Sequence, residues 1–229
     1  YEALFGWQGP ERTATGPAQE VRFLRGQPVA GIRPMAGALE SRWRIHVGVA
    51  DAQETGRKVV AAGGKLVVEP TRLGTHGRFA GFADTAGVEF AVWEAGDHKG
   101  AGLIAEQGAF AWSELITDDA GMSAAFYGAV FGWTLTAPAA DDRSRRCEWQ
   151  WRGRSIAGLL PRPPAMPKEI RPYWDVFFGV SDPAAAVESV TRLGGKNLMP
   201  PIDTAHGRIA VFMDPAGVVF SVIAPKTHR

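Results

Sequence analysis

The chain repeats itself at a long offset, and this repeat constrains its fold more than any other feature of the sequence. Residues 1–7, YEALFGW, match residues 127–133, YGAVFGW, at five of seven positions. Residues 76–93, HGRFAGFADTAGVEFAVW, match residues 206–223, HGRIAVFMDPAGVVFSVI, at 11 of 18 positions. The two offsets are 126 and 130 residues. An offset that stays nearly constant along a chain marks a duplicated structural unit.

The repeat predicts two homologous domains in tandem, at residues 1–95 and 109–229. Residues 96–108 between them are rich in Gly and carry several charged side chains, which is typical of a linker between domains. We therefore expect the same arrangement of helices and strands to occur twice.

Periodicity in the second copy predicts an α+β fold in which the order β-α-β-β-β occurs twice. Alternating apolar residues indicate strands, and apolar residues at helical spacing indicate helices. An Asp is expected to cap the start of each helix, and Gly194 and Gly195 to end the second one. The expected strands are 110–117, 133–137, 146–152, 155–161, 173–180, 197–200, 207–213 and 217–224, and the expected helices are 118–133 and 182–193.

Charge and cysteine content exclude several classes of protein. The chain has 25 Lys and Arg against 24 Asp and Glu without a basic block, so we expect no nucleic-acid partner. The single cysteine, Cys147, excludes an intramolecular disulfide framework and a multi-cysteine metal site. Neither a signal peptide nor an apolar run of 18 residues occurs, which predicts a cytoplasmic protein with no membrane partner.

The order of elements, with FYGAVFGW at the end of one helix and DPAGVVFSVI in the last hairpin, resembles the vicinal oxygen chelate superfamily. This superfamily contains glyoxalases, bleomycin-resistance proteins and extradiol dioxygenases. The tandem arrangement, with WSEL, AGLLPRP and YWDVFFGV, is similar to two-domain glyoxalase-like proteins of actinobacteria. The resemblance implies paired βαβββ modules whose cup-shaped mixed sheets hold a small-molecule substrate or ligand. It also implies a monomer that forms a pseudo-dimer, or a homodimer, and a first module that lacks its first strand and half of its first helix.

Many members of the superfamily bind a divalent metal in the cup. They use a residue in the first strand of each module and a Glu in the last strand. Counted from the Asp residues that cap the helices and turns, these positions hold Arg44, Ala91, Trp112, Asp175 and Ser221 in this chain. A catalytic metal needs about three protein ligands from His, Cys or carboxylate side chains, and Asp175 alone cannot supply them. We therefore expect neither a metal nor another cofactor.

Residues with the same parity as these positions are expected to face the cup, because side chains alternate along a strand. In the second domain, Glu114 and Asp175 would form a catalytic carboxylate pair. Two carboxylates in an apolar cavity acquire different pKa values, which suits general acid–base catalysis. Trp112, Tyr173 and Phe177 would line the same cavity and hold a ligand.

The same residues also have structural interpretations. Glu114 could form a salt bridge with Arg152 or Arg154, and Asp175 could pair with an Arg from the Pro-rich connection at 161–172. The aromatic side chains could fill the interior without contacting any ligand.

Histidines suggest two further places for chemistry. In the first cup, Arg44 could bind an anionic or carbonyl oxygen and His46 could move a proton, although His46 could also be a hydrogen-bonded wall residue. His76 and His206 each open the repeated hairpin before Gly-Arg. They could contact a ligand at the mouth of a cup, or they could be structural residues of a turn.

Together these residues predict a metal-independent enzyme of lyase, isomerase, cyclase or hydrolase type that acts on a natural-product or metabolite intermediate. The alternative is a protein that sequesters a ligand between aromatic walls, as bleomycin-resistance proteins do. A metal-dependent glyoxalase or dioxygenase is the third and least favoured possibility.

Overall fold

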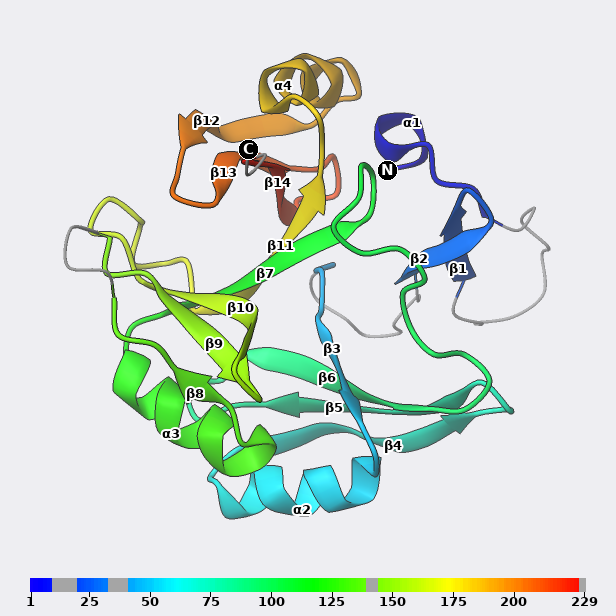
Figure 1. The fold of residues 1–229 in the computed structure, drawn as a ribbon, viewed down its shortest axis with the longest axis vertical. Coiled ribbons are helices and arrows are strands. Elements are labelled where there is room, and N and C mark those ends of the chain that lie inside the picture. The colour runs from blue at the N-terminus through cyan, green and yellow to red at the C-terminus, as the bar shows by residue number, and fades with distance from the viewer. Residues whose placement is uncertain (10–19, 33–40, 139–143, 227–229) are drawn as a thin grey trace. The chain divides into compact units, whose positions relative to one another are not determined.

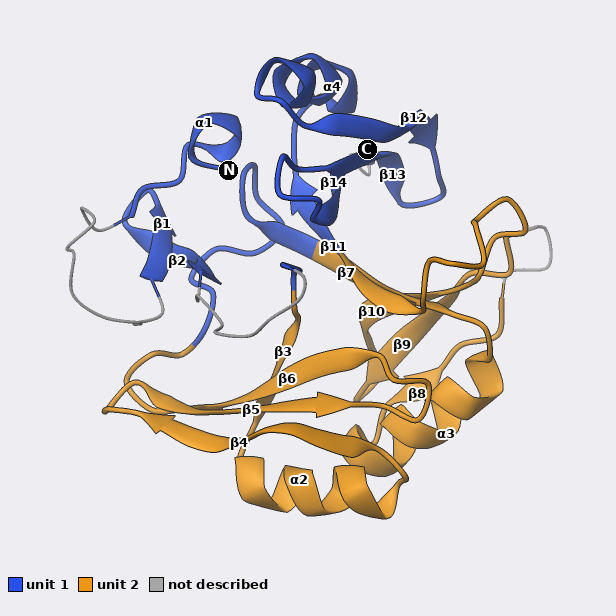
Figure 2. Cartoon of the chain, turned by 180° about the vertical axis from the view of Figure 1, so that it is seen from behind, with its two compact units in different colours: residues 1–43, 100–111, 176–229 blue, residues 44–99, 112–175 orange. Residues whose placement is uncertain are grey.

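The computed structural model describes residues 1–9, 20–32, 41–138 and 144–226. The chain forms two compact units (Figure 2). Unit 1 comprises residues 1–43, 100–111 and 176–229, and unit 2 comprises residues 44–99 and 112–175. The described residues include no helix that is long and apolar enough to cross a membrane.

Unit 2 contains two groups of four hydrogen-bonded strands and two helices (Figure 1). The strand orders are β3-β6-β5-β4 and β7-β10-β9-β8. β3 runs parallel to β6 and β7 runs parallel to β10, whereas the other neighbours are antiparallel. The elements are β3 (His46–Val49), α2 (Ala52–Ala61), β4 (Lys65–Leu73), β5 (Gly77–Ala83), β6 (Glu89–Ala95), β7 (Phe110–Thr117), α3 (Ala120–Phe131), β8 (Thr134–Leu135), β9 (Cys147–Trp151) and β10 (Arg154–Pro161).

Unit 1 contains a third group of four strands, in the order β12-β13-β14-β11, and a separate antiparallel pair, β1-β2. β11 runs parallel to β14, as the corresponding strands do in unit 2. The first two residues of β7 belong to unit 1 and the first three of β11 to unit 2. The elements are α1 (Glu2–Phe5), β1 (Glu20–Leu24), β2 (Gln27–Ile32), β11 (Tyr173–Gly179), α4 (Pro183–Arg192), β12 (Lys196–Asp203), β13 (Gly207–Met213) and β14 (Val219–Pro225).

The α+β fold class and the βαβββ order predicted from the second copy are confirmed. Asp119 and Asp182 cap α3 and α4, because their carboxylates accept hydrogen bonds from the backbone N–H groups of Met122 and Ala184, each at 2.8 Å. α3 ends at Gly132, whose φ of 71° lies in the left-handed region that suits Gly.

Tyr127 of α3 lies at the centre of the unit 2 core and joins two parts of the chain. Its hydroxyl donates to Oδ2 of Asp84 at 3.2 Å and accepts from Nε1 of Trp174 at 2.9 Å. Asp84, in the turn between β5 and β6, also accepts from the backbone N–H groups of Ala86 and Val88. These bonds connect a helix of the second tandem copy to a hairpin of the first.

Unit 1 contains the same arrangement, but here the Tyr comes from the first tandem copy and the Asp from the second. The Tyr1 hydroxyl donates to Oδ2 of Asp214 at 3.0 Å and accepts from Nε1 of Trp43 at 2.9 Å. Trp7 stacks on Tyr1 with ring centroids 5.6 Å apart, and Trp133 stacks on Tyr127 at 5.7 Å. The paired tryptophans of the FGW motif are thus packing residues in both units.

The compact units therefore divide the chain differently from the tandem copies 1–95 and 109–229. Each unit takes its aromatic helix end from one copy and its Asp-containing hairpin from the other (Figure 2). The tandem boundaries remain a prediction about how the duplication runs along the sequence.

Candidate functional site

A cluster of polar and aromatic side chains occupies one face of β7, β10 and β11 in unit 2. Leu115, Leu159 and Trp174 belong to the hydrophobic core of this unit. Because side chains alternate along a strand, their neighbours project from the opposite face. Those neighbours are Trp112 and Glu114 on β7, Gly158 on β10, and Tyr173 and Asp175 on β11.

Glu114 forms a two-pronged ion pair with Arg146. Nε of Arg146 lies 2.5 Å from Oε1 of Glu114, and Nη2 lies 3.1 Å from Oε2. The Glu114 side chain is 4% exposed and that of Arg146 is 19% exposed. A charge-assisted pair of this geometry is stronger than a neutral hydrogen bond and fixes the orientation of both groups.

The predicted partners of Glu114, Arg152 and Arg154, are therefore wrong. Arg152 lies in the turn between β9 and β10, and its guanidinium stacks over the Trp151 ring at 4.4 Å. Arg154 begins β10, four residues before the position that pairs with Glu114. Neither arginine is at the level of the carboxylate along the sheet.

Gly158 lies between two carboxylate-bearing residues across the sheet. It pairs with Glu114 of β7 on one side and with Glu148 of β9 on the other. A Cβ atom at residue 158 would come within 2.8 Å of Oε1 of Glu114 and 3.1 Å of Nε1 of Trp112. Because Gly158 has no side chain, the Glu114 carboxylate and the Trp112 indole can occupy the space above it.

Asp175 and Tyr173 complete the cluster from β11. Asp175 is buried, with 4% exposure, and Tyr173 is half-buried. Burial raises the pKa of the Tyr173 phenol, and the negative charges of Asp175 and Glu114 raise it further, against the opposing charge of Arg162. Tyr173 therefore stays protonated, and its hydroxyl keeps the capacity to donate a hydrogen bond.

Arg162 lies in the Pro-rich connection at 161–172, from which we expect a possible Arg partner for Asp175. Its guanidinium forms an ion pair with Asp118, in which Nη2 lies 3.3 Å from Oδ2, and Nη1 donates to the carbonyl oxygen of Pro167 at 3.1 Å. Phe177, two residues beyond Asp175 on β11, is buried and belongs to unit 1.

His46 is the first residue of β3, on the other sheet of unit 2, and Arg44 lies two residues before it. Ile45 and Val47 pack against the core, so Arg44 and His46 project from the opposite face, as the parity of the strand predicts. Arg44 forms an ion pair with Glu89. His46 is exposed, yet desolvation by the surrounding protein and the charge of Arg44 lower its pKa to about 4.

The repeated His-Gly-Arg turns owe their form to glycine. Gly77 and Gly207 have φ values of 151° and 153°, and a Cβ atom would come within 2.5 Å and 2.3 Å of a backbone carbonyl oxygen in the last strand. His76 and His206 are exposed in these turns, and their backbone carbonyl groups accept hydrogen bonds from the chain beyond the last strand. A ligand-binding role for the two imidazoles stays a prediction.

Arg78, which follows Gly77, pairs with Glu94 at the other end of the hairpin. Nη1 of Arg78 lies 3.3 Å from Oε2 of Glu94, the carboxylate that also accepts from the first backbone N–H of α2. Asp84 instead bonds to Tyr127 and to its own turn.

The residues at the expected metal-ligand positions do not fit a divalent cation. The Arg44 side chain is itself a cation, and the Ala91 side chain has no atom that can bind a metal. The Trp112 indole N–H donates hydrogen bonds and cannot act as a metal ligand. Only Asp175 and Ser221 then remain as possible metal ligands. The part of the chain that the structure describes contains no group of three or more His, Cys, Asp or Glu that could hold a metal ion. No cofactor role is therefore assigned to these residues, and metal independence stays a prediction.

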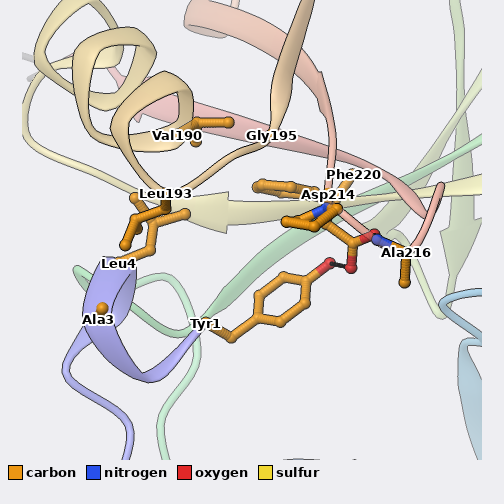
Figure 3. Close-up of a pocket in the computed structure, with 10 residues that line it drawn as sticks. Tyr1, Ala3, Leu4, Val190, Leu193, Gly195, Asp214, Ala216 and Phe220 are labelled. Atoms are coloured by element: carbon orange, nitrogen blue, oxygen red, sulfur yellow. Dashed lines mark hydrogen bonds between the residues drawn. The ribbon is translucent and has the colours of Figure 1, made fainter.

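A pocket of about 300 Å³ lies in unit 1 between α1, α4 and the β13–β14 turn (Figure 3). Val190 and Gly195 on its wall correspond in the repeat to Val59 and Gly64 of unit 2. A Cβ atom at Gly64 would lie 2.8 Å from the Phe126 ring, so in unit 2 this wall packs against α3. The pocket of unit 1 therefore corresponds to a surface that packs against a helix in unit 2. The Tyr1 and Asp214 side chains that line the pocket form a hydrogen bond with each other.

Sequence reasoning missed Arg146 and Gly158. The alternation in RCEWQWR, with Cys147 and Trp149 buried in the core, places Arg146 on the same side of the sheet as Glu114. That signal is present in the sequence, but it becomes informative only when the strand order β7-β10-β9 is known.

Comparison with known proteins relates the chain to glyoxalase-like proteins. A family model described as "Glyoxalase-like domain" matches residues 113–223. The chain is 32% identical over 237 residues to "Putative glyoxylase CFP32" of Mycobacterium bovis, covering 100% of this chain and 89% of that protein. It is also 32% identical over 241 residues to "Anthracycline biosynthesis protein DauV" of Streptomyces sp. strain C5, covering 97% of this chain and 86% of that protein.

Solved structures with the same fold share little sequence with the chain. The 2,3-dioxygenase LapB from Pseudomonas sp. KL28 aligns with a TM-score of 0.62 and 13% identity, covering 100% of this chain and 87% of that one. The Mn(II)-bound glyoxalase from Novosphingobium aromaticivorans aligns with a TM-score of 0.58 and 17% identity, covering 98% and 78%. At such identities the likeness concerns the fold alone.

Proposed function

Because the chain belongs to the glyoxalase-like family of the vicinal oxygen chelate superfamily, we propose that it is a metal-independent enzyme acting on a small natural-product intermediate. The observation that carries this proposal is the pair of buried carboxylates, Glu114 and Asp175, on one face of the unit 2 strands beside Tyr173 and Trp112. Carboxylates are rarely buried unless they are paired, and buried ionisable groups gather at functional sites.

The chemistry is a proton transfer of the kind that lyases, isomerases, cyclases and hydrolases share. Asp175 takes a proton from an acidic C–H or O–H group of the substrate, and the protonated Tyr173 donates a hydrogen bond to the oxygen on which negative charge develops. Glu114, paired with Arg146, provides fixed charge beside them. Trp112 offers a flat apolar surface to a planar substrate.

The relatives support a substrate from secondary metabolism. Two relatives, from Streptomyces sp. strain C5 and Streptomyces peucetius, bear the name "Anthracycline biosynthesis protein". We propose that this chain likewise acts on a planar polycyclic intermediate. Arg44 and His46, at and just before the start of β3, form a second proposed site, in which a neutral His46 could accept a proton.

Isosteric changes of the two carboxylates test the catalytic proposal. Purified protein is incubated with a panel of anthraquinones and anthracycline aglycones, and products are followed by liquid chromatography and mass spectrometry. Asp175→Asn should lower turnover about 100-fold or more, because general acid–base catalysis contributes factors of this size. Glu114→Gln should also lower turnover, because it removes the fixed charge beside Asp175. Both variants should keep most of their affinity for the substrate. Glu188→Gln, which alters an exposed carboxylate on α4, is the matched control.

Metal independence needs its own measurement. Protein purified without chelators should contain well under one equivalent of metal by elemental analysis, and treatment with a chelator should leave turnover unchanged. A full equivalent of metal, whose removal abolishes turnover and whose return restores it, would contradict the proposal.

The second candidate is a ligand-sequestering protein without chemistry. The ion pair favours it, because Arg146 occupies both oxygens of the Glu114 carboxylate. In that case Trp112→Ala should weaken ligand binding more than Asp175→Asn or Glu114→Gln does, and no product should form with the wild-type protein.

A further inference from the structure

The hairpin formed by β9 and β10 has a counterpart in the other tandem copy. β1 and β2 align with β9 and the start of β10 at an offset of 127 residues, and an Arg-Gly pair forms the turn in each hairpin. Arg25 and Arg152 both have a φ of 51°, and Gly26 and Gly153 both have a φ of 74°. The two turns therefore share one geometry, and their side chains can be compared position by position.

An Arg at the first central position of such a turn is unusual. Positive φ values at both central residues mark a type I′ turn, which prefers Asn, Asp or Gly at its first position. Other L-residues seldom adopt the left-handed conformation, because their Cβ atom approaches the following carbonyl oxygen. In unit 1 the Arg25 guanidinium forms an ion pair with the carboxylate of Glu106, in the segment that follows β6.

The equivalent Arg152 in unit 2 has no such carboxylate within the part of the chain that the structure describes. Its Cζ lies 4.4 Å from the centre of the Trp151 ring. Arg154, which pairs with Trp151 across the turn, also forms no ion pair with a described residue. Glu148, the carboxylate of β9, accepts a hydrogen bond from the Ser155 hydroxyl. Two positive charges thus stand at this turn without an acidic partner among the described residues.

The residues that flank the turn also differ between the copies. Leu24 and Gln27 pair across the turn in unit 1, and Trp151 and Arg154 take their places in unit 2. Trp151 is 44% exposed, although its indole is large and apolar. Trp and Arg are the residues that most often dominate binding energy at protein interfaces, and the planar guanidinium suits a carboxylate. Trp151, Arg152 and Arg154, here called the hairpin tip, therefore combine an exposed apolar ring with two donors for acidic groups.

We propose that the hairpin tip docks an acidic segment of a partner protein. A Glu or Asp side chain of that segment takes the place beside Arg152 that Glu106 has beside Arg25 in unit 1. An apolar side chain next to it packs on the Trp151 indole, and Arg154 binds a second acidic group.

The number of cations favours a protein partner over a polyanion. Anionic membranes and nucleic acids are bound by clusters of several Lys and Arg residues. The hairpin tip has two arginines, and the whole chain has 25 basic against 24 acidic residues.

This surface is separate from the cluster around Glu114. Arg154 lies four residues before Gly158, the β10 residue that pairs with Glu114. Four residues of a strand span about 13 Å. The proposal therefore goes beyond the proposed function and does not depend on it.

Two peptides that differ only in charge test the proposal. One is acetylated and amidated Gly-Glu-Leu-Glu-Glu-Leu-Glu-Gly, and the other has Gln in place of each Glu. Each is added at low ionic strength to the full chain labelled with ¹⁵N, and the indole N–H signal of Trp151, assigned with a Trp151→Phe variant, is followed by NMR. The acidic peptide should shift this signal to saturation. The Gln peptide should bind about tenfold more weakly or less, because charged hydrogen bonds are replaced by neutral ones.

Variants of exposed residues assign the binding to the hairpin tip. Arg152→Gln and Arg154→Gln should each weaken binding of the acidic peptide about threefold, as expected for the loss of an exposed ion pair. Trp151→Ala should weaken it about tenfold or more, followed at the Arg152 backbone amide. Arg25→Gln is the matched control, because it changes the equivalent arginine of unit 1, which Glu106 already engages, and it should leave the affinity unchanged.

The proposal is overturned if wild-type protein binds the two peptides equally, if it binds neither, or if Arg25→Gln weakens binding as much as Arg152→Gln does. Vesicles that contain phosphatidylserine and a single-stranded DNA oligonucleotide are titrated in parallel. Tighter binding of either one than of the acidic peptide at Trp151 would assign the hairpin tip to a membrane or a nucleic acid and remove the proposal. These results leave the proposed function untouched, because product formation with the carboxylate variants tests it separately.

Discussion

His46 has an exposed side chain on β3, yet its pKa is lowered to about 4 by desolvation and by the charge of Arg44. The ordinary pKa of a histidine is about 6.5. Between pH 6.5 and pH 4 the unfolded chain therefore binds a proton at this residue that the folded chain does not. By linkage, the contribution of His46 to stability is complete above pH 6.5 and is lost as the pH falls toward 4.

We predict that His46→Gln makes the free energy of unfolding depend less on pH between pH 6.5 and pH 4. Urea unfolding at several pH values between 4 and 7.5 should show that wild-type protein loses more stability on acidification than the variant does. An NMR titration of the His46 ring should give a midpoint below 6.5, the ordinary pKa of a histidine. A midpoint near 6.5 would contradict the prediction.

At the same scale, the alternation of side chains along the strands predicted which residues lie on the face opposite the hydrophobic core. It did not predict which of these residues contact one another. It correctly separated Glu114 and Asp175 from their neighbours Leu115 and Trp174, which pack in the unit 2 core. The partner of Glu114 could not be predicted, because Arg146 comes from a strand that is not adjacent to β7. Its identity depends on the order of strands across the sheet and on the missing side chain at Gly158, both of which are tertiary facts.

At the scale of elements, the hydroxyl of Tyr127 joins α3 to the β5–β6 hairpin, and we expect its removal to lower the stability of the fold. Tyr127→Phe leaves the buried indole N–H of Trp174 without its acceptor and takes a donor from Asp84. The loss of a buried hydrogen-bond partner costs about 1–3 kcal/mol. We predict a decrease of this size in the free energy of unfolding, measured by urea denaturation with tryptophan fluorescence.

Tyr1→Phe is the matched change in the other unit. Tyr1 bonds to Trp43 and Asp214 in the same pattern, but it is half-buried where Tyr127 is fully buried. Water can replace part of what is lost there, so the effect should be smaller. Equal losses from the two variants would show that burial does not govern the strength of this link.

At the scale of the whole molecule, the duplication and the periodicities predicted the βαβββ order and the α+β class. They did not predict that each compact unit combines parts of both copies. The physical reason is that the copies carry interchangeable partners. Asp84 and Asp214 accept hydrogen bonds within equivalent turns, and Tyr1 and Tyr127 each lie four residues before the last residue of equivalent helices. Local sequence cannot tell which Tyr pairs with which Asp, and the choice depends on how the whole chain packs.

The exchanged pairs of Tyr and Asp have an evolutionary consequence. After an ordinary gene duplication, the two copies can diverge independently, because each keeps its own internal contacts. Here a substitution at Tyr127 in one copy changes the surroundings of Asp84 in the other, and Tyr1 and Asp214 are linked in the opposite direction. We therefore expect each Tyr to vary together with its Asp partner in the other repeat, and not with the residues of its own repeat.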